Sequence, residues 1–406
     1  MSQSESRSTA IKALIPALGL AEYWYPGLLA RKVGRRPVGL KMLGRPLVFF
    51  RGKDGQVVAA SNTCPHRGGS LMDGECHYKG TVACPYHGWV FDESGECLAV
   101  LSEGPESTVP GTVKLRIFPT SEHKGLVFVW MGEGEPVAIT EDIPPEFFEN
   151  EQTALFTSAR DWAVNWRASL ENALDSHVMY VHRNALLQLM EPIQQFGHIG
   201  YHPRIVNGKT AIGYLKDPPR EGREYYPGVD HYWPKTQWRK LWLWAFAWRS
   251  ARIRNSRPFL KENEEWGMHT KVDGKFVRSA GHHLPSMFRF DFGGQMYTRF
   301  CVPVTEELTR VFYIHASRRK TRLGRASRAA YFHLFRNWAL NINFSTQDYD
   351  VMAGQDYDAP ETLSTSDGQL IRWRRLLLTA RGMPGGLEDE TTNVRRGDFP
   401  AHGVGE

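Results

Sequence analysis

The sequence predicts an α+β protein whose first part is built from short strands and whose second part combines strands with helices. Three observations support this prediction. The 406 residues include 38 glycines and 24 prolines, about 15% of the chain against ~12% in an average soluble protein. Short apolar runs separated by turn residues fill the first part, and the longer helical patterns follow later in the chain.

In the first part, strands alternate with tight turns. Residues 46–51 are expected to form a strand, 53–56 a hairpin turn and 57–60 the return strand, because Asp-Gly is a strong hairpin signal. A second turn is predicted at 92–95. Further strands are predicted at 81–83, 89–91 and 126–130.

The second part opens with a helical pattern over residues 166–190, for which Asn165 is the expected N-cap. A long helical stretch is predicted over 325–355. Between them, strands are predicted at 275–279, 286–292, 295–304 and 308–316.

These patterns predict four segments along the chain. They are an N-terminal arm over residues 1–40, a first domain over 41–150, a second domain over 151–385 and a tail over 386–406. The boundary near 150 rests on an acidic, proline-containing stretch that precedes it. The tail is rich in glycine and charged residues.

The charge of the chain is mildly basic, with 50 Lys and Arg against 44 Asp and Glu and a net charge of +6. A nucleic-acid-binding protein concentrates its basic excess on one face or motif, so no nucleic-acid partner is expected. The densest basic run extends from Arg318 to Arg322 and continues to Arg325 and Arg328. We interpret it as a solvated helix end or loop, with a docking patch for an acidic electron-transfer partner as the alternative.

Targeting signals are not evident in the sequence. The first residues lack the basic start and apolar core of a signal peptide, and no apolar run approaches the ~18 residues of a membrane span. We therefore expect a soluble, cytoplasmic protein with no integral membrane span.

Four of the five cysteines lie between positions 64 and 97. Two of them belong to the motifs CPHRG, starting at Cys64 and including His66, and CPYHGW, starting at Cys84 and including His87. Two Cys and two His suit a structural zinc site or a Rieske [2Fe–2S] cluster, in which two Cys bind one iron and two His the other. Zinc fingers separate their Cys pair from their His pair, so one Cys and one His per loop favours the Rieske cluster.

In combination, the two motifs resemble those of Rieske non-haem iron oxygenases, the terminal components of aromatic ring-hydroxylating systems. The resemblance implies an all-β Rieske domain followed by a helix-grip catalytic domain with an antiparallel sheet and C-terminal helices. It also implies that Cys64 and Cys84 bind one iron of the cluster, and His66 and His87 the solvent-facing iron. Cys76 and Cys97 do not match ligand positions and are interpreted as packing thiols, although Cys76 with His77 is the nearby pair that could compete.

A second group of polar residues follows in NWRASLENALDSHVMYVH, residues 165–182. Two histidines and a distant carboxylate can form a facial triad that leaves positions open for O2 and substrate at Fe(II). The segment resembles the family pattern Asn-x2-Asp-x2-His-x4-His, which implies His177 and His182 as ligands of a mononuclear Fe(II). By the same resemblance, Asp175 transfers electrons between neighbouring subunits and Asn172 lies near the iron.

This segment departs from the family pattern in one place. One residue separates Asp175 from His177, where the family usually has two. On a regular helix these two residues would be ~200° apart, and His177 and His182 ~140° apart, so a regular helix does not direct all three side chains to one face. A break or a π-bulge is therefore expected at residues 176–179, since such bulges are frequent at functional sites.

The third ligand must come from farther along the chain, where the resemblance places it on a C-terminal helix. Asp348 is preferred because it follows Gln347 and precedes the apolar step at 351–352. Asp350 and Asp356 are the alternatives.

The stretches EDIPPEFF and DWAVNWRASLEN, at 141–148 and 161–172, are similar to those of the catalytic subunits of carbazole and oxoquinoline oxygenases. That similarity implies a homotrimer of one kind of subunit. Electrons would come from NAD(P)H through a ferredoxin and/or a reductase, and an aromatic or polycyclic or heterocyclic substrate would be mono- or dihydroxylated with O2. Oxidative O- or N-demethylation, and electron transfer without oxygenase activity, are the alternatives.

Overall fold

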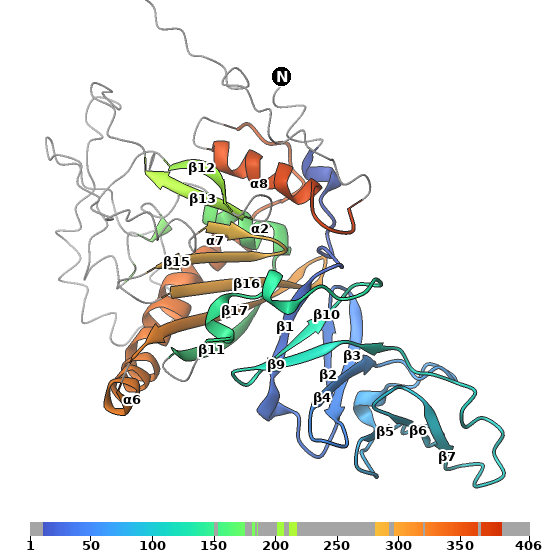
Figure 1. Cartoon of the computed structure of the whole chain (residues 1–406). Helices are drawn as coiled ribbons and strands as arrows, with labels where there is room; N and C mark the ends of the chain where they lie inside the picture. The colour runs from blue at the N-terminus through green and yellow to red at the C-terminus, as the bar shows by residue number, and fades with distance from the viewer. Residues whose placement is uncertain are drawn as a thin grey trace, which may run out of the picture.

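The computed structural model of the chain describes residues 11–149, 153–174, 181–182, 185, 201–206, 211–216, 281–291, 296–319, 321–363 and 367–383. In this part of the chain, short strands come first and a larger antiparallel sheet with helices follows (Figure 1). The predicted α+β fold class is confirmed.

Three small antiparallel sheets form the first region, with the strand orders β1-β10-β9, β2-β3-β4-β8 and β5-β6-β7. Their strands are β1 (Trp24–Leu29), β2 (Val38–Met42), β3 (Arg45–Arg51), β4 (Val57–Ser61), β5 (Thr81–Ala83), β6 (Trp89–Asp92), β7 (Cys97–Val100), β8 (Ile117–Phe118), β9 (Thr120–His123) and β10 (Leu126–Trp130). Short 3-10 helices lie at Ala30–Lys32, Leu71–Asp73, Ile139–Glu141 and Pro145–Phe147. The strands predicted in this region are confirmed, and β1 and β2 arise from the segment expected as an N-terminal arm.

The predicted turns at 53–56 and 92–95 are also present. Each has its glycine, Gly55 or Gly95, at φ +84°. Glycine adopts this left-handed conformation without the steric cost that a side chain adds.

Strands β3 and β4 are buried on both faces, which explains their unbroken apolar sequences. In β3, Leu47 and Phe49 contribute to the core shared with β1 and β10. Val48 and Phe50 point the other way, into the core that contains Cys64 and the strands β5 to β7. Because successive side chains alternate across a strand, one strand supplies two cores and needs apolar residues at every position.

The second region is a seven-stranded antiparallel sheet with the order β11-β17-β16-β15-β14-β13-β12. Its strands are β11 (Thr153–Trp162), β12 (Tyr201–Val206), β13 (Ala211–Lys216), β14 (Gly281–His283), β15 (Met287–Asp291), β16 (Met296–Thr305) and β17 (Leu308–Arg318). The strands predicted at 286–292, 295–304 and 308–316 are confirmed. The strand predicted at 275–279 lies outside the described residues.

The two faces of this sheet pack against different parts of the molecule. The strand registers align Ser158, Tyr313, Arg299, Phe288 and His282 in one row across the sheet. Side chains of this row contact helices, as shown by Ser158 with Asn341 and by Arg299 with Ser169. Neighbouring positions on the opposite face, such as Phe300 and Phe312, join the core formed with β1 and β10.

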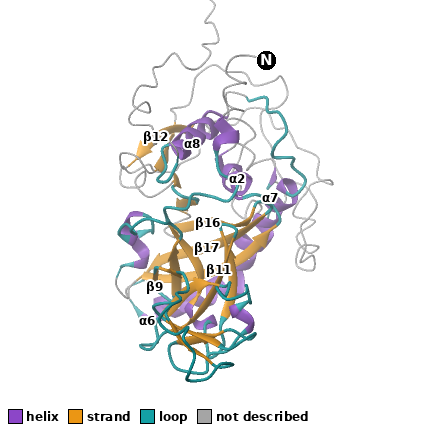
Figure 2. Cartoon of the chain, turned by 90° about the vertical axis from the view of Figure 1, so that its right-hand side faces the viewer, coloured by secondary structure: helices purple, strands orange, loops and turns teal. Residues whose placement is uncertain are grey.

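The helices on the first of these faces are α2 (Trp166–Glu171), the 3-10 turn η5 (Asn172–Leu174), α6 (Arg322–Tyr331), the π-helix η8 (Phe332–Phe344) and α7 (Ser345–Met352). The long helix predicted over 325–355 is therefore present as the run α6-η8-α7. The last helix, α8 (Gly368–Leu378), lies beside α2 at the end of the molecule away from β9 in both views (Figures 1 and 2).

Candidate metal centres

Two loops with the same hydrogen-bond scheme hold Cys64 and Cys84. In each loop the cysteine N–H donates to the carbonyl five residues later, at 2.8 Å in both. The N–H of Gly68 returns to the Cys64 carbonyl at 2.9 Å, and that of Gly88 to the Cys84 carbonyl at 3.0 Å. Both glycines have positive φ, +73° and +65°, which glycine tolerates best. The two halves of this site are thus copies of one local structure.

The thiols of Cys64 and Cys84 are buried between these loops and contact each other. Burial raises the pKa of Cys64 to about 11, and the Cys84 thiol also raises it, while the backbone N–H groups of His66 and Arg67 lower it. A Cβ at Gly69 would lie 2.9 Å from Cys84 Sγ, so glycine keeps the space beside this sulfur open. Two adjacent thiols with backbone donors directed at sulfur fit an iron–sulfur cluster, which ionises its thiol ligands.

The two loop histidines lie nearer the surface than the thiols. His66 is exposed and His87 is half-buried, and their ring centroids are 4.5 Å apart. Trp89 stacks on His66 at 4.7 Å with an interplanar angle of 4°. Inner thiols and outer imidazoles form a donor set that fits a Rieske cluster, in which one iron takes sulfur ligands and the other nitrogen ligands.

The other residues of the cysteine-rich segment have separate environments. Cys97 is fully buried in β7, with its Sγ 3.7 Å from the carbonyl of Ala99. Cys76 is half-buried and packs against the same core. His77 is partly exposed, with Nδ1 3.3 Å from Glu75. These surroundings support packing roles for Cys76 and Cys97.

A second centre joins two residues that lie far apart in the sequence. His182 Nε2 is 2.8 Å from Asp348 Oδ1, and both side chains are buried, 1% and 4% exposed. The His182 ring stacks on Phe344 at a centroid distance of 3.4 Å. An imidazole and a carboxylate held together in a buried site have the chemistry of two of the three ligands in a facial triad.

The alternative carboxylates have different surroundings. Asp350 lies on the same helix, α7, but is exposed, and Asp356 is exposed in the following loop. Neither carboxylate forms an ion pair with another of the described residues. Burial against His182 therefore favours Asp348.

Two of the predicted site residues, Asp175 and His177, lie outside the described residues, as does the predicted break at 176–179. Asn172 is half-buried where α2 ends, and its N–H donates to carbonyls of α2. The described residues contain a π-helix elsewhere, η8, which leads directly into α7 and Asp348.

Helix α2 begins as the sequence predicts, with Asn165 as its N-cap. The Asn165 side chain accepts a hydrogen bond from the N–H of Arg167 at 3.0 Å. It also donates to the carbonyls of Ala17 and Glu306 at 3.1 and 2.6 Å. The cap therefore fixes the start of the helix to two distant segments of the chain.

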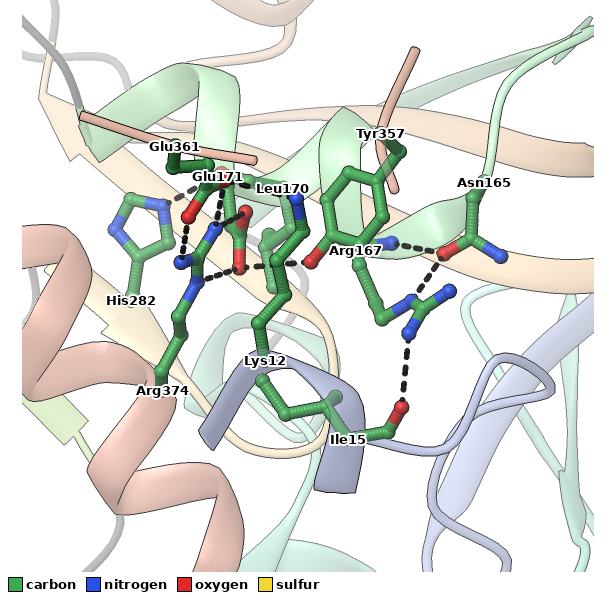
Figure 3. Close-up of polar contacts among 10 residues, drawn as sticks. All are labelled: Lys12, Ile15, Asn165, Arg167, Leu170, Glu171, His282, Tyr357, Glu361 and Arg374. Carbon is green, nitrogen blue, oxygen red and sulfur yellow. Dashed lines mark hydrogen bonds and ion pairs between the residues drawn. The ribbon is translucent and has the colours of Figure 1, made fainter. Parts of the chain in front are cut away.

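A buried network of charges fixes the other end of α2 (Figure 3). Arg374 of α8 binds both carboxylate oxygens of Glu171, each at 2.8 Å, and both of Glu361, at 2.6 and 2.9 Å. Lys12 lies 3.0 Å from Glu361, and the Tyr357 hydroxyl donates to Glu171 at 3.2 Å. This network joins α2, α8, the loop after α7 and the N-terminal segment.

The last carbonyls of α2 are bound from the sheet below. Arg299 of β16 donates to the Ser169 carbonyl at 3.0 Å, and His282 Nε2 lies 3.1 Å from the Leu170 carbonyl (Figure 3). Burial holds the pKa of His282 well below its usual value, so a neutral ring donates this bond. Arg299 is not among the site residues predicted from the sequence. The available signal was that Arg299 is the only charged residue in the strand predicted at 295–304.

Two family models match the chain. The Rieske [2Fe–2S] domain matches residues 23–119, and the homotrimeric ring hydroxylase domain matches residues 130–220. The chain therefore carries a Rieske [2Fe–2S] domain followed by a ring hydroxylase domain.

Curated relatives align with this chain over part of their length. The terminal oxygenase component of carbazole 1,9a-dioxygenase from Sphingomonas sp is 38% identical over 172 residues, which is 42% of this chain and 45% of the relative. The oxygenase subunit of 3-chlorobenzoate-3,4-dioxygenase from Comamonas testosteroni is 30% identical over 230 residues, which is 52% of this chain and 50% of the relative. The chain thus spans about half the length of the curated relatives it matches.

Solved structures support the fold over nearly the whole chain. The terminal oxygenase of carbazole 1,9a-dioxygenase from Novosphingobium sp. KA1 matches with a TM-score of 0.70 and 24% identity, covering 93% of this chain and 97% of that one. Its counterpart from Nocardioides aromaticivorans IC177 matches with a TM-score of 0.67 and 22% identity, covering 90% of this chain and 96% of that one. Among the described helices of this chain, none is long and apolar enough to cross a membrane.

Proposed function

We propose that this chain is the terminal oxygenase of a multicomponent system that hydroxylates an aromatic, polycyclic or heterocyclic substrate with O2. One observation carries the proposal: the chain has two separate metal-donor sets, one of paired Cys-His loops and one that includes a buried His-Asp pair. A chain that only transferred electrons would need the first set alone.

In the proposed assignment, Cys64, His66, Cys84 and His87 hold the [2Fe–2S] cluster. The buried cysteines and the outer histidines support this assignment, because an electron donor would approach the nitrogen-ligated side. Trp89, stacked on His66, limits the access of water to that side.

His177, His182 and Asp348 are proposed to hold a mononuclear Fe(II). When bound, the cluster supplies single electrons and the mononuclear iron supplies a site for O2. The chain's own contribution is to bury Asp348 against His182 and to keep α2 fixed at both ends. Asn172 is proposed to lie near the iron, and Asp175 to connect it to the cluster of a neighbouring subunit.

The proposed organisation is an N-terminal arm over 1–40, a Rieske domain over 41–150, a catalytic domain over 151–385 and a tail over 386–406. The name of the second family model, a homotrimeric ring hydroxylase, supports a homotrimer. The structures of relatives solved as complexes of oxygenase and ferredoxin support a ferredoxin as electron donor, itself reduced through an NAD(P)H-dependent reductase. A cytoplasmic location fits a protein that depends on NAD(P)H.

Oxidative demethylation is the second candidate activity. The oxygenase component of dicamba O-demethylase from Stenotrophomonas maltophilia is 32% identical to this chain over 163 residues. That degree of similarity is close to the 33% of the carbazole enzyme from Metapseudomonas resinovorans. Ring hydroxylation is preferred because carbazole oxygenases match both by sequence and by fold.

Oxygen incorporation distinguishes these activities. The purified chain, with a surrogate ferredoxin, reductase and NADH, is supplied with 18O2 and a panel containing fused heteroaromatics, benzoates and methoxybenzoates. We expect substrate-dependent O2 uptake and labelled oxygen in a hydroxylated ring. Formaldehyde release from a methoxybenzoate, without ring label, would favour the demethylase. O2 uptake that no substrate stimulates would contradict both.

A further inference from the structure

Arg299 is a buried cation beside the proposed mononuclear site. It lies on β16, is 4% exposed and points to the helix-covered face of the sheet. Its guanidinium carbon is 5.6 Å from the ring centroid of Trp162 and 5.7 Å from that of Phe288. A guanidinium stays protonated in proteins, so this charge must be compensated where it is.

The compensating carboxylate belongs to Asp348. Arg299 Nη1 is 3.8 Å from Asp348 Oδ2, an ion-pair distance. The other carboxylate oxygen, Oδ1, is 2.8 Å from His182 Nε2. The two oxygens of one carboxylate therefore face different partners, the arginine on one side and the proposed ligand histidine on the other.

Arg299 also reaches helix α2. Its Nη2 donates to the Ser169 carbonyl at 3.0 Å, near the end of the helix whose chain continues toward His182. One planar side chain thus contacts both α2, which ends just before Asn172, and the carboxylate of Asp348 on α7. Lysine, with a single ammonium, lacks the fork that makes two such contacts at once.

We propose that Arg299 is a positioning residue for the mononuclear iron site. It holds Oδ2 of Asp348, keeps Oδ1 turned toward His182, and sets the distance between α7 and α2. This inference rests on the proposed function. Partners of this kind, which orient a ligand without binding the metal, typically change metal affinity by about 10–100-fold when removed.

The neighbouring strand offers a matched control. Arg289 on β15 is also 4% exposed, and it binds Glu146. It is paired across the strands with Thr298, the residue before Arg299, and so lies on the opposite face of the sheet. Arg289→Gln removes an equally buried arginine without touching Asp348.

The test is iron binding by the full-length chain. Mononuclear iron is removed with a chelator that leaves the cluster intact, as its visible absorption reports, and Fe(II) is titrated back anaerobically. The nitric oxide complex of the Fe(II) is then recorded by EPR with the cluster oxidised and EPR-silent. We expect Arg299→Gln to raise the dissociation constant for Fe(II) by about 10–100-fold and to alter the EPR line shape. The dissociation constant of Arg299→Lys should lie between those of Arg299→Gln and the wild type. Arg289→Gln should match the wild type in both measurements.

The outcomes separate this proposal from the proposed function. Wild-type affinity and line shape in Arg299→Gln, or an equal loss in Arg289→Gln, would overturn the positioning role. If Arg299→Gln does not fold, Arg299→Lys decides: weaker Fe(II) binding than the wild type supports the role, and equal binding contradicts it. A wild-type chain that binds no mononuclear Fe(II) contradicts the proposed function instead.

Discussion

The two proposed metal-donor sets are built in different ways. Each half of the first is a short loop whose backbone hydrogen bonds close on themselves, and the loop at Cys84 repeats the loop at Cys64 bond for bond. The second brings together His182 and Asp348, which contact each other through the packing of α7 onto the sheet. The first set depends on local backbone geometry, whereas the second depends on the packing of distant elements.

This contrast predicts that cysteine substitutions act locally. Cys84→Ser is expected to abolish the cluster, because the paired thiols are its proposed sulfur donors, and to abolish product formation with it. Cys76→Ser, which alters a half-buried thiol of the same segment, should keep the cluster. Visible absorption and the EPR signal after reduction measure the cluster content of both variants. A cluster retained in Cys84→Ser would contradict the assignment of the loops.

Substitution at the second set should separate the two centres. Asp348→Asn is expected to lose mononuclear iron and to lower turnover by more than about 100-fold, beyond the effect of removing a supporting residue, while the cluster remains. Asp350→Asn, on the exposed side of the same helix, should keep both metals and its activity. Metal analysis with cluster absorption checks this prediction. It is wrong if the two variants lose equal amounts of iron.

Substitutions in the buried charge network around α2 should show how much this network stabilises the packing on which the His182–Asp348 contact depends. Arg374→Met would leave the buried carboxylate of Glu171 without its cation, whereas Glu361 keeps Lys12. The expected cost is about 3–5 kcal/mol in the free energy of unfolding. Arg310→Met breaks an ion pair whose Asp161 is 44% exposed, which should cost about 0–1 kcal/mol. Urea unfolding gives the free energy of unfolding of both variants. Equal costs would show that burial does not set the strength of this network.

A smaller, pH-dependent effect is expected from His315 on β17. Burial lowers its pKa to about 4, although the hydrogen bond to Asn341 opposes this shift. The folded state then binds fewer protons than the unfolded state, whose histidine has a pKa of about 6.5. The stability contributed by neutral His315 is therefore complete above about pH 6.5 and is lost as the pH falls toward 4, by roughly 3 kcal/mol in total.

His315→Gln should flatten this dependence between pH 6.5 and 4. Thermal unfolding across that range measures it. A slope as steep in the variant as in the wild type would assign the acid sensitivity to other groups.

The contrast also explains what the sequence could predict. The loops at Cys64 and Cys84 were recognisable because ligand spacing, proline and glycine are all local features. The strands at 46–51 and 308–316 followed from apolar patterning and turn signals in the same way. The contact of Asp348 with His182 had to come from family resemblance, since no periodicity links residues so far apart.

Arg299 shows most clearly what the sequence alone does not predict. An arginine inside a strand carries no local sign of which face it occupies or which carboxylate it meets. Its position becomes clear only from the registers that align it with Tyr313 and Phe288. The buried pair of Glu171 and Arg374 likewise depends on the placement of α8 beside α2.

The central claim, two metal centres in one chain, is tested most directly by counting metals. Iron and acid-labile sulfide are measured on the purified, fully loaded wild-type chain, together with the EPR spectrum after reduction. We expect three irons and two sulfides per chain, the stoichiometry of one [2Fe–2S] cluster plus one mononuclear iron, with a rhombic signal from the cluster. Two irons and two sulfides, with no further Fe(II) bound on titration, would contradict it.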